Sequence, residues 1–495
     1  MDRIKNLLPA GKPYRLLAGG VLLWWGLSFW YERFAFEPGS AALRPFTYLC
    51  IKLLSLAVMA ALVFFFTAAI RGRKERTAAA ATLSCALPLF VLVTGFWAVS
   101  HAWPIQYGDQ RNILFAAMTY DTMTGFFFYL TMWVPMVAMT LIPVPAFVVV
   151  FKILLISLGV GYCIMRLRRL TGSPAVWLLY FPFLMPPGLY LSYNIHRIPM
   201  YAVLYLVFSC KLLCDAREGR KPGRGGGVLL CLTAAVLTQW RSEGIYLVVL
   251  APILLWLTYR PALDRRGKAL ALAVFLAAQL LVQLPQKLDT AGQDLSDRTM
   301  PLFEYLITGM ERKGLDKEKN AADLAIVDRY IDLEALHALN EELGDYCYND
   351  NLILYYGMRP NPSKADKADF RAAMIRIVLH NPGVYLRNQF CAWIHISEEQ
   401  YHDRKLDELA NIFQRLYLPT LWLFAVWVWT LVRKRWLLWF VTSGHLCHMV
   451  ITTLLLPASY FKYYYSEYLY AFLMLVLTLC FLHERRLARK AARTA

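Results

Sequence analysis

The chain contains a series of apolar runs, most of them about 16 to 24 residues long, and these runs limit its fold more than any other feature. An α-helix needs about 20 apolar residues to cross the hydrocarbon core of a bilayer. Hydrophobic residues make up 58% of the 495 residues and charged residues only 17%, which excludes a disordered chain, a coiled coil and an ordinary soluble domain. The sequence therefore predicts an all-α polytopic membrane protein.

The charges are unevenly distributed along the chain. Residues 286–414 hold 22 acidic and 15 basic residues, a net charge of −7, whereas the remainder carries a net charge of +25. This basic excess lies in short links between the apolar runs, where Lys and Arg mark the cytoplasmic side. The positive charges that give the chain its net charge of +18 are therefore expected to set its orientation in the membrane. No nucleic-acid partner is expected from them.

Two basic links fix the first part of the topology. The links at residues 71–76 and 166–169 should both be cytoplasmic, so an even number of crossings must separate them. We assign two crossings, at residues 77–100 and 146–165. The intervening apolar stretch, residues 122–142, is then expected to lie at the outer face or to dip into it. Prolines at positions 135, 143 and 145 favour a broken path there.

The same reasoning over the whole chain predicts about twelve crossings, with both termini cytoplasmic, in a multi-pass protein of the cell membrane. The first run has no small-residue cleavage site and is followed directly by a second, so it is expected to be a retained span. The predicted spans are residues 16–31, 47–70, 77–100, 146–165, 174–191, 198–213, 227–239, 245–259, 269–285, 416–432, 436–457 and 468–482.

Three regions follow from this pattern. Residues 1–285 form an amino-terminal transmembrane module with an outer acidic loop at 101–145. Residues 286–415 form a mainly helical extracytoplasmic segment, with helices expected at 321–343 and 367–380, and residues 416–495 form the last membrane helices and a basic cytoplasmic tail. Cys347 and Cys391 fall in the large outer segment. They either form a disulfide there or stay as two free thiols. No metal-ligand spacing or nucleotide-binding motif is found, so no metal site and no cofactor are expected.

The first candidate residue is Asp109, in the sequence Tyr107-Gly108-Asp109-Gln110-Arg111-Asn112. A carboxylate partly shielded from water can remove a proton from a hydroxyl group as a general base. Asp109 can equally cap a short interfacial helix over residues 110–119, because Asp is a frequent helix N-cap. Arg111 adds a positive charge beside it.

Three further cations lie in links predicted to be on the outer side. Arg197 either binds a phosphate through its guanidinium fork or reaches the lipid headgroups. Arg241 and Glu243, in the turn between two short spans, either lie at a functional site below the membrane surface or simply pair with each other. Lys462 can add positive charge to a phosphate site, while its neighbouring tyrosines are expected to anchor the chain at the interface.

Together, one early carboxylate and several scattered cations on the outer side fit group transfer from a lipid phosphate. An apolar groove would hold the lipid tail, the cations would stabilise the departing phosphate, and the carboxylate would activate the acceptor hydroxyl.

This pattern resembles the GT-C superfamily of membrane glycosyltransferases, which use polyprenyl-phosphate-linked sugars. In that family an acidic residue lies in the first long outer loop before interfacial helices, and Tyr107-Gly108-Asp109 with residues 122–142 is similar to this arrangement. Residues 189–194 look like the segment that often carries a second acidic motif. Residues 239–244 are similar to an arginine-containing turn of the family, and residues 380–386 to an Asn-Pro-x-x-Tyr-like motif before its late membrane helices.

The chain departs from the family pattern at two places. Two spans, rather than one, precede the span that leads to the acidic loop, which suggests an added hairpin. His196 and Arg197 stand where the family has an Asp or Glu. A divalent metal held between two acidic motifs is therefore not expected, and this departure favours a metal-independent mechanism.

The resemblance implies an inverting glycosyltransferase that moves a hexose or pentose from a polyprenyl-phosphate carrier to a cell-envelope glycan or lipid on the outer face. Asp109 would be the general base, Arg197 and Arg241 the phosphate ligands, and Arg111, Glu243 and Lys462 supporting residues. Two alternatives stay open: a lipid or glycan transporter or flippase, and an envelope polymerase or ligase that moves a preassembled glycan.

Overall fold

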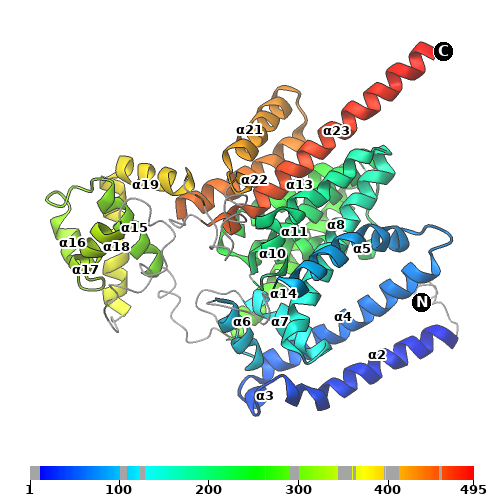
Figure 1. Ribbon diagram of the computed structural model, residues 1–495, viewed down its shortest axis with the longest axis horizontal. Coiled ribbons are helices and arrows are strands. Elements are labelled where there is room, and N and C mark those ends of the chain that lie inside the picture. Colours follow the sequence, from blue (N-terminus) through cyan, green and yellow to red (C-terminus); the bar gives the residue numbers. More distant parts are fainter. Residues whose placement is uncertain are drawn as a thin grey trace. The chain divides into compact units, whose positions relative to one another are not determined.

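The computed structural model describes residues 12–100, 109–122, 129–195, 197–261, 263–289, 300–343, 359, 364–394, 396, 412–455 and 460–494. The regular elements of these residues are helices (Figure 1), which confirms the predicted all-helical class. The chain divides into two compact units. Unit 1 comprises Met1–Ala291, Thr430–Val441 and Leu469–Ala495, and unit 2 comprises Gly292–Trp429 and Thr442–Tyr468.

The predicted apolar runs form helices with closely similar bounds. Among the described residues, seven helices are long and apolar enough to cross a membrane, or up to eight if one bent pair counts as a single span. Others are shorter; a helix of 13 residues, such as α13, is only about 20 Å long, against a hydrocarbon core of about 30 Å. The chain is thus a helical membrane protein. The helices that match predicted spans are α2 (Lys12–Tyr31), α4 (Pro45–Arg71), α5 (Ala78–Val99), α8 (Pro145–Thr171), α11 (Arg197–Glu218), α12 (Arg224–Trp240), α13 (Leu247–Tyr259), α14 (Arg265–Asp289), α21 (Tyr417–Val432), α22 (Trp436–Leu455) and α23 (Tyr465–Thr494).

One predicted span is bent rather than continuous. Residues 174–191 form η2 (Pro174–Tyr180), α9 (Phe181–Leu184) and α10 (Pro186–Tyr193), with a bend of 73°. Prolines at 182, 186 and 187 lack the backbone donors that a continuous helix requires. Lys152 of α8, only 3% exposed, donates its Nζ to the carbonyl oxygens of Leu191, at 2.8 Å, and Asn194. An amine donor thereby satisfies carbonyl groups at the carboxyl end of α10, which a helix end leaves without partners.

The stretch expected to be broken at three prolines contains one continuous helix. After α6 (Asp109–Met118), α7 (Tyr129–Leu141) runs through Pro135, so the break expected at that proline is wrong. The helix is interrupted at residues 142–144 and α8 begins at Pro145, so the break expected at Pro143 and Pro145 is present. Met132, Met136 and Ala138 are fully buried, and α7 packs against α4, α6 and α8. Neighbouring helices can accommodate a proline in this way. The location of this segment relative to the outer face stays a prediction.

Four basic segments of unit 1 meet at one end. Arg169 donates its Nη2 to the carbonyl oxygen of Arg76 at 2.8 Å, which joins the end of α8 to the link between α4 and α5. Arg166 of α8 pairs with Asp215 near the end of α11 at 2.8 Å, and Arg217 of α11 pairs with Glu484 in the tail of α23 at 2.7 Å. These contacts agree with the prediction that the links at 71–76 and 166–169 lie on one side.

Segments predicted to lie on the outer side also contact one another. The amide of Glu37, in the link between α2 and α4, donates to the carbonyl oxygen of Met118 at 2.9 Å. Arg44 of the same link pairs with Asp121 at 3.2 Å. The link that contains η1 (Glu32–Phe34) and α3 (Ser40–Leu43) therefore packs against the end of α6.

The closest helix packing in unit 1 joins α5 and α8 at Gly161. A Cβ at this position would lie 2.7 Å from the backbone nitrogen of Ala86 and 2.8 Å from the carbonyl oxygen of Thr82. Only glycine allows the two backbones to approach so closely.

Unit 2 has its own hydrophobic core, formed by helices of the acidic segment. Met310, Val327, Ile331, Phe370 and Ile377 are essentially fully buried in this core. The helix expected over 321–343 is divided in two, because the carboxylate of Asp332 caps the second part by accepting from the amide of Ala335 at 3.0 Å. The described helices of unit 2 are α15 (Met300–Arg312), α16 (Ala321–Val327), α17 (Leu333–Leu343), α18 (Lys364–His380), α19 (Pro382–Ile394) and η6 (Phe461–Tyr464), together with most of α21 and α22 and the first turn of α23.

Candidate functional site

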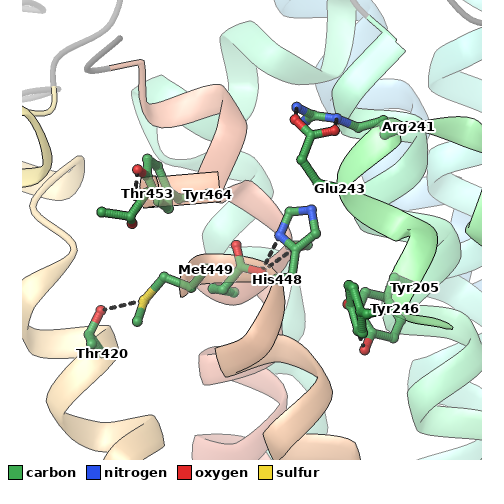
Figure 2. A network of polar contacts seen from close by, with 11 residues as sticks. Tyr205, Arg241, Glu243, Tyr246, Thr420, His448, Met449, Thr453 and Tyr464 are labelled. Atoms are coloured by element: carbon green, nitrogen blue, oxygen red, sulfur yellow. Dashed lines mark hydrogen bonds and ion pairs between the residues drawn. The ribbon is translucent and has the colours of Figure 1, made fainter. Parts of the chain in front are cut away.

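Arg241 and Glu243 form a buried ion pair in unit 1. Arg241 follows α12 in an extended conformation, and Glu243 lies in the first turn of η3 (Ser242–Tyr246). The Arg241 Nε donates to Glu243 Oε2 at 3.2 Å and its Nη2 donates to Oε1, so the pair is bidentate (Figure 2). The two residues are 3% and 4% exposed. Of the two alternatives raised by the sequence, mutual pairing is therefore present, and the carboxylate fixes the direction of the guanidinium group.

The turn that carries this ion pair depends on a glycine. A Cβ on Gly244 would lie 2.5 Å from the carbonyl oxygen of Leu237 in α12, so a larger residue would push η3 away from α12. On the other side of the turn, the Tyr246 hydroxyl donates to the Tyr205 hydroxyl of α11 at 3.3 Å (Figure 2). The end of α12 and a side chain of α11 thus hold the turn that carries the ion pair.

Lys462 lies in η6 of unit 2 and is 6% exposed. Its Nζ lies 4.4 Å from the ring centroid of Tyr460 and 5.8 Å from that of Tyr463. Aromatic faces attract a cation at these distances. The tyrosines expected to serve as interfacial anchors therefore also surround this charge.

A cluster of polar side chains in unit 2 joins α22 to the start of α23. His448 Nδ1 lies 2.7 Å from Glu467 Oε1, and the Ser466 hydroxyl donates to the same oxygen at 2.7 Å (Figure 2). All three residues of this His448 cluster (His448, Ser466 and Glu467) are at most 2% exposed. Imidazole and carboxylate groups are side chains that commonly transfer protons in proteins.

The sequence analysis did not identify this cluster. Around Lys462 the sequence predicted only tyrosines that anchor the chain at the interface, and His448 was not among the predicted site residues. The sequence does contain a feature that could have identified this cluster: His448 lies within one apolar run, and a Glu stands at the start of the next. Ionisable residues within membrane helices are functional candidates by default.

The Asn-Pro-x-x-Tyr-like motif begins α19 and supports the end of α22. The Tyr385 hydroxyl donates to the carbonyl oxygen of Leu454 at 2.5 Å, and Gln389 Nε2 donates to the same oxygen at 2.9 Å and to that of Thr453 at 2.8 Å. These bonds satisfy carbonyl groups that a helix end leaves without partners. Burial raises the pKa of the Tyr385 phenol, so this donor stays protonated at neutral pH.

The other predicted site residues are placed only in part. Asp109 is the first residue of α6 and Arg197 the first residue of α11, and the side chains of both lie outside the described part of the structure. The predicted short helix after Asp109 is present, and Arg111 lies on its exposed side. The structure therefore brings Arg241 and Glu243 together, and the convergence of Asp109 with Arg197 and Arg241 stays a prediction.

Metal ligation and disulfide formation can be considered only for the described residues. In that part of the chain, no group of three or more His, Cys, Asp or Glu side chains could hold a metal ion. Cys347 lies outside the described residues, so the predicted alternatives for Cys347 and Cys391 are untested.

Comparison with known proteins supplies no relative from which a role could be transferred. No family model, curated protein or solved structure matches the chain.

Proposed function

We propose that this protein is a GT-C-like membrane glycosyltransferase that transfers a sugar from a polyprenyl-phosphate carrier to a cell-envelope glycan or lipid. The single observation that carries the proposal is the buried Arg241, whose guanidinium is oriented by Glu243 at a helix junction. Burying a charge is costly, and such residues within membrane proteins usually mark a site of function. A phosphate monoester or diester is an anion that suits this guanidinium.

The proposed topology has about twelve crossings with both termini in the cytoplasm. Support comes from the clustering of the basic links at one end of unit 1, where Arg169 reaches the carbonyl of Arg76. Because positive links stay on the cytoplasmic side, this end would face the cytosol. A basic link precedes α12, and the turn that contains Arg241 follows the other end of this helix. That turn would therefore lie towards the outer face.

In the proposed reaction, Asp109 takes a proton from the acceptor hydroxyl, whose oxygen attacks the anomeric carbon of the donor sugar. The bond between that carbon and the phosphate oxygen breaks, and the polyprenyl phosphate leaves with the bonding electron pair. Arg197 and Arg241 stabilise the phosphate charge that develops, with Arg111 as a supporting charge. Attack opposite the leaving group inverts the anomeric configuration.

The test is a transfer assay on the purified full-length protein in lipid nanodiscs. Polyprenyl-phosphate-linked glucose and arabinose with radiolabelled sugars are supplied with a cell-envelope lipid fraction, and labelled product is measured. We expect Asp109→Asn to lower turnover about 100-fold or more, the usual contribution of a general base. Asp121→Asn is the matched control, because Asp121 is a nearby carboxylate that pairs with Arg44. Wild-type turnover by the Asp109 variant would refute the base assignment, and no transfer by the wild type would refute this donor class.

A second candidate function is proton-coupled transport of a lipid or glycan, and the His448 cluster is the observation that favours it. Proton relays in membrane transporters use Glu and His side chains enclosed by helices, as His448 and Glu467 are. In proteoliposomes with a pH gradient, a transporter would move a fluorescent lipid-linked sugar, and Glu467→Gln would abolish this movement. Glu484→Gln, in the partly exposed tail, is the control. This candidate would be eliminated if the lipid-linked sugar moved independently of the pH gradient and at the wild-type rate in both the Glu467→Gln and the Glu484→Gln variants.

A further inference from the structure

A cavity of about 410 Å³ lies between α12, α13 and α14 of unit 1, apart from the ion pair described above. Its walls are almost entirely apolar. They include Leu230, Ile253, Trp256, Leu272 and Phe275. Binding sites for small molecules commonly have volumes of about 300–1,000 Å³ and apolar walls with few polar groups.

Cations border this cavity where α13 ends and α14 begins. Arg260 and Lys268 line it directly, and Arg260 Cζ lies 5.0 Å from the ring centroid of Trp256, which is 45% exposed. Arg265 and Arg266, the first two residues of α14, add positive charge beside the link between α13 and α14. The acidic residue of this link, Asp264, accepts from the amide of Gly267 at 2.9 Å and so caps α14. An apolar cavity with a basic border is complementary to a lipid with an anionic headgroup.

The position of the cavity separates it from the proposed donor site. The residues of α12 that line it, Gly227, Leu230 and Cys231, lie in the first half of that helix, whereas Arg241 follows its other end. α12 has 17 residues and is therefore about 25 Å long, close to the thickness of the hydrocarbon core. A headgroup held by Arg260 would thus belong to the opposite leaflet from a headgroup held by Arg241.

We propose that this cavity binds an anionic phospholipid, with one acyl chain against the apolar walls and the phosphate between Arg260 and Lys268. Arg260 and Lys268 border the cavity at the basic end of unit 1, which faces the cytoplasmic leaflet in the proposed topology, and that leaflet is rich in anionic lipids. Trp256 supports the headgroup region, since tryptophan favours the membrane interface. The bound lipid would hold α12, α13 and α14 together at this end.

Native mass spectrometry of the full-length protein tests this proposal, with phosphatidylglycerol and phosphatidylcholine of identical acyl chains as probes. We expect phosphatidylglycerol to bind more tightly, and the double variant Arg260→Gln/Lys268→Gln to weaken its affinity about 30-fold, because each cation near an anionic headgroup contributes about fivefold. The matched control is Arg433→Gln/Lys434→Gln, which removes the same charge from the link between α21 and α22.

A second variant tests the acyl-chain position without changing any charge. Ala271→Phe places a ring in the wall of the cavity and should lower the affinity for both phospholipids. Equal affinity for the two lipids, or wild-type phosphatidylglycerol binding by both the double variant and Ala271→Phe, would overturn the proposal. Stronger binding of polyprenyl phosphate than of phosphatidylglycerol at this cavity would overturn the assignment of its occupant.

Discussion

Asp215 is the centre of a buried network whose removal should strongly destabilise unit 1. Its Oδ1 accepts from Arg166 Nη2 of α8 at 2.8 Å, and its Oδ2 accepts from Lys211 Nζ at 2.7 Å and from the Tyr259 hydroxyl of α13 at 2.6 Å. Asp215 is 2% exposed, so water cannot replace these bonds. Asp215→Asn keeps the size of the side chain, removes its charge and leaves the Arg166 guanidinium buried without this carboxylate.

Losing one partner of a buried ion pair costs about 3–5 kcal/mol, which is our expected loss of unfolding free energy for Asp215→Asn. Glu218→Gln is the matched control. Glu218 also contacts Arg166, at 3.2 Å, but it is partly exposed and its other partner, Arg220, is largely exposed. Pairs of that kind contribute at most about 1 kcal/mol. Tyr259→Phe, which removes one hydrogen bond to a charged group, should cost about 1.5–3 kcal/mol.

The free energies can be measured by reversible unfolding of the purified variants in mixed micelles of increasing SDS fraction. The reasoning predicts the order Asp215→Asn, then Tyr259→Phe, then Glu218→Gln, from most to least destabilised. The assigned role of this network would be refuted if Asp215→Asn lowered the unfolding free energy by less than about 1 kcal/mol. It would also be refuted if Glu218→Gln lowered it by more than Asp215→Asn does.

Three further predictions concern single contacts, each measured by the same unfolding assay. Gly161→Ala should destabilise the protein by about 1–3 kcal/mol, because its new methyl group meets the backbone of α5 and no side chain can move aside; wild-type stability would refute the close packing. Tyr385→Phe should cost about 0.5–1.5 kcal/mol by removing the donor to Leu454, and an unchanged stability would remove that role. Lys152→Met should cost about 1–3 kcal/mol because the buried carbonyl groups at the end of α10 lose their donor; a stabilised variant would contradict this.

The apolar runs predicted the helices because span length depends mainly on local composition, and the bounds of α4 and α5 differ from the expected ones by only one or two residues. Basic links likewise predicted which helix ends of unit 1 meet, since Arg76 and Arg169 are in contact. The effect of proline was less predictable. Pro135 lies within a continuous helix, whereas the prolines around residue 186 accompany a bend, and packing by neighbouring helices decides between these outcomes.

The candidate site was predicted less completely for a physical reason. Arg241 and Glu243 are two residues apart, so their pairing could be expected from the sequence alone. His448 and Glu467 lie on different helices, and 19 positions separate them, so only the packing of α22 against the start of α23 brings them together. The same limit applies to Lys152, whose partners are about 40 residues further along the chain.

The central claim is that the phosphate of a polyprenyl-phosphate sugar binds beside Arg241. Its most direct test is a cryo-EM map of the full-length protein in nanodiscs with a C-glycoside phosphonate analogue of the donor, which cannot be cleaved. The account predicts phosphonate density within hydrogen-bonding distance of Arg241 and Arg197, with the anomeric carbon facing Asp109. A well-resolved analogue held elsewhere, with Arg241 still enclosed by protein and Asp109 remote from the sugar, would contradict it.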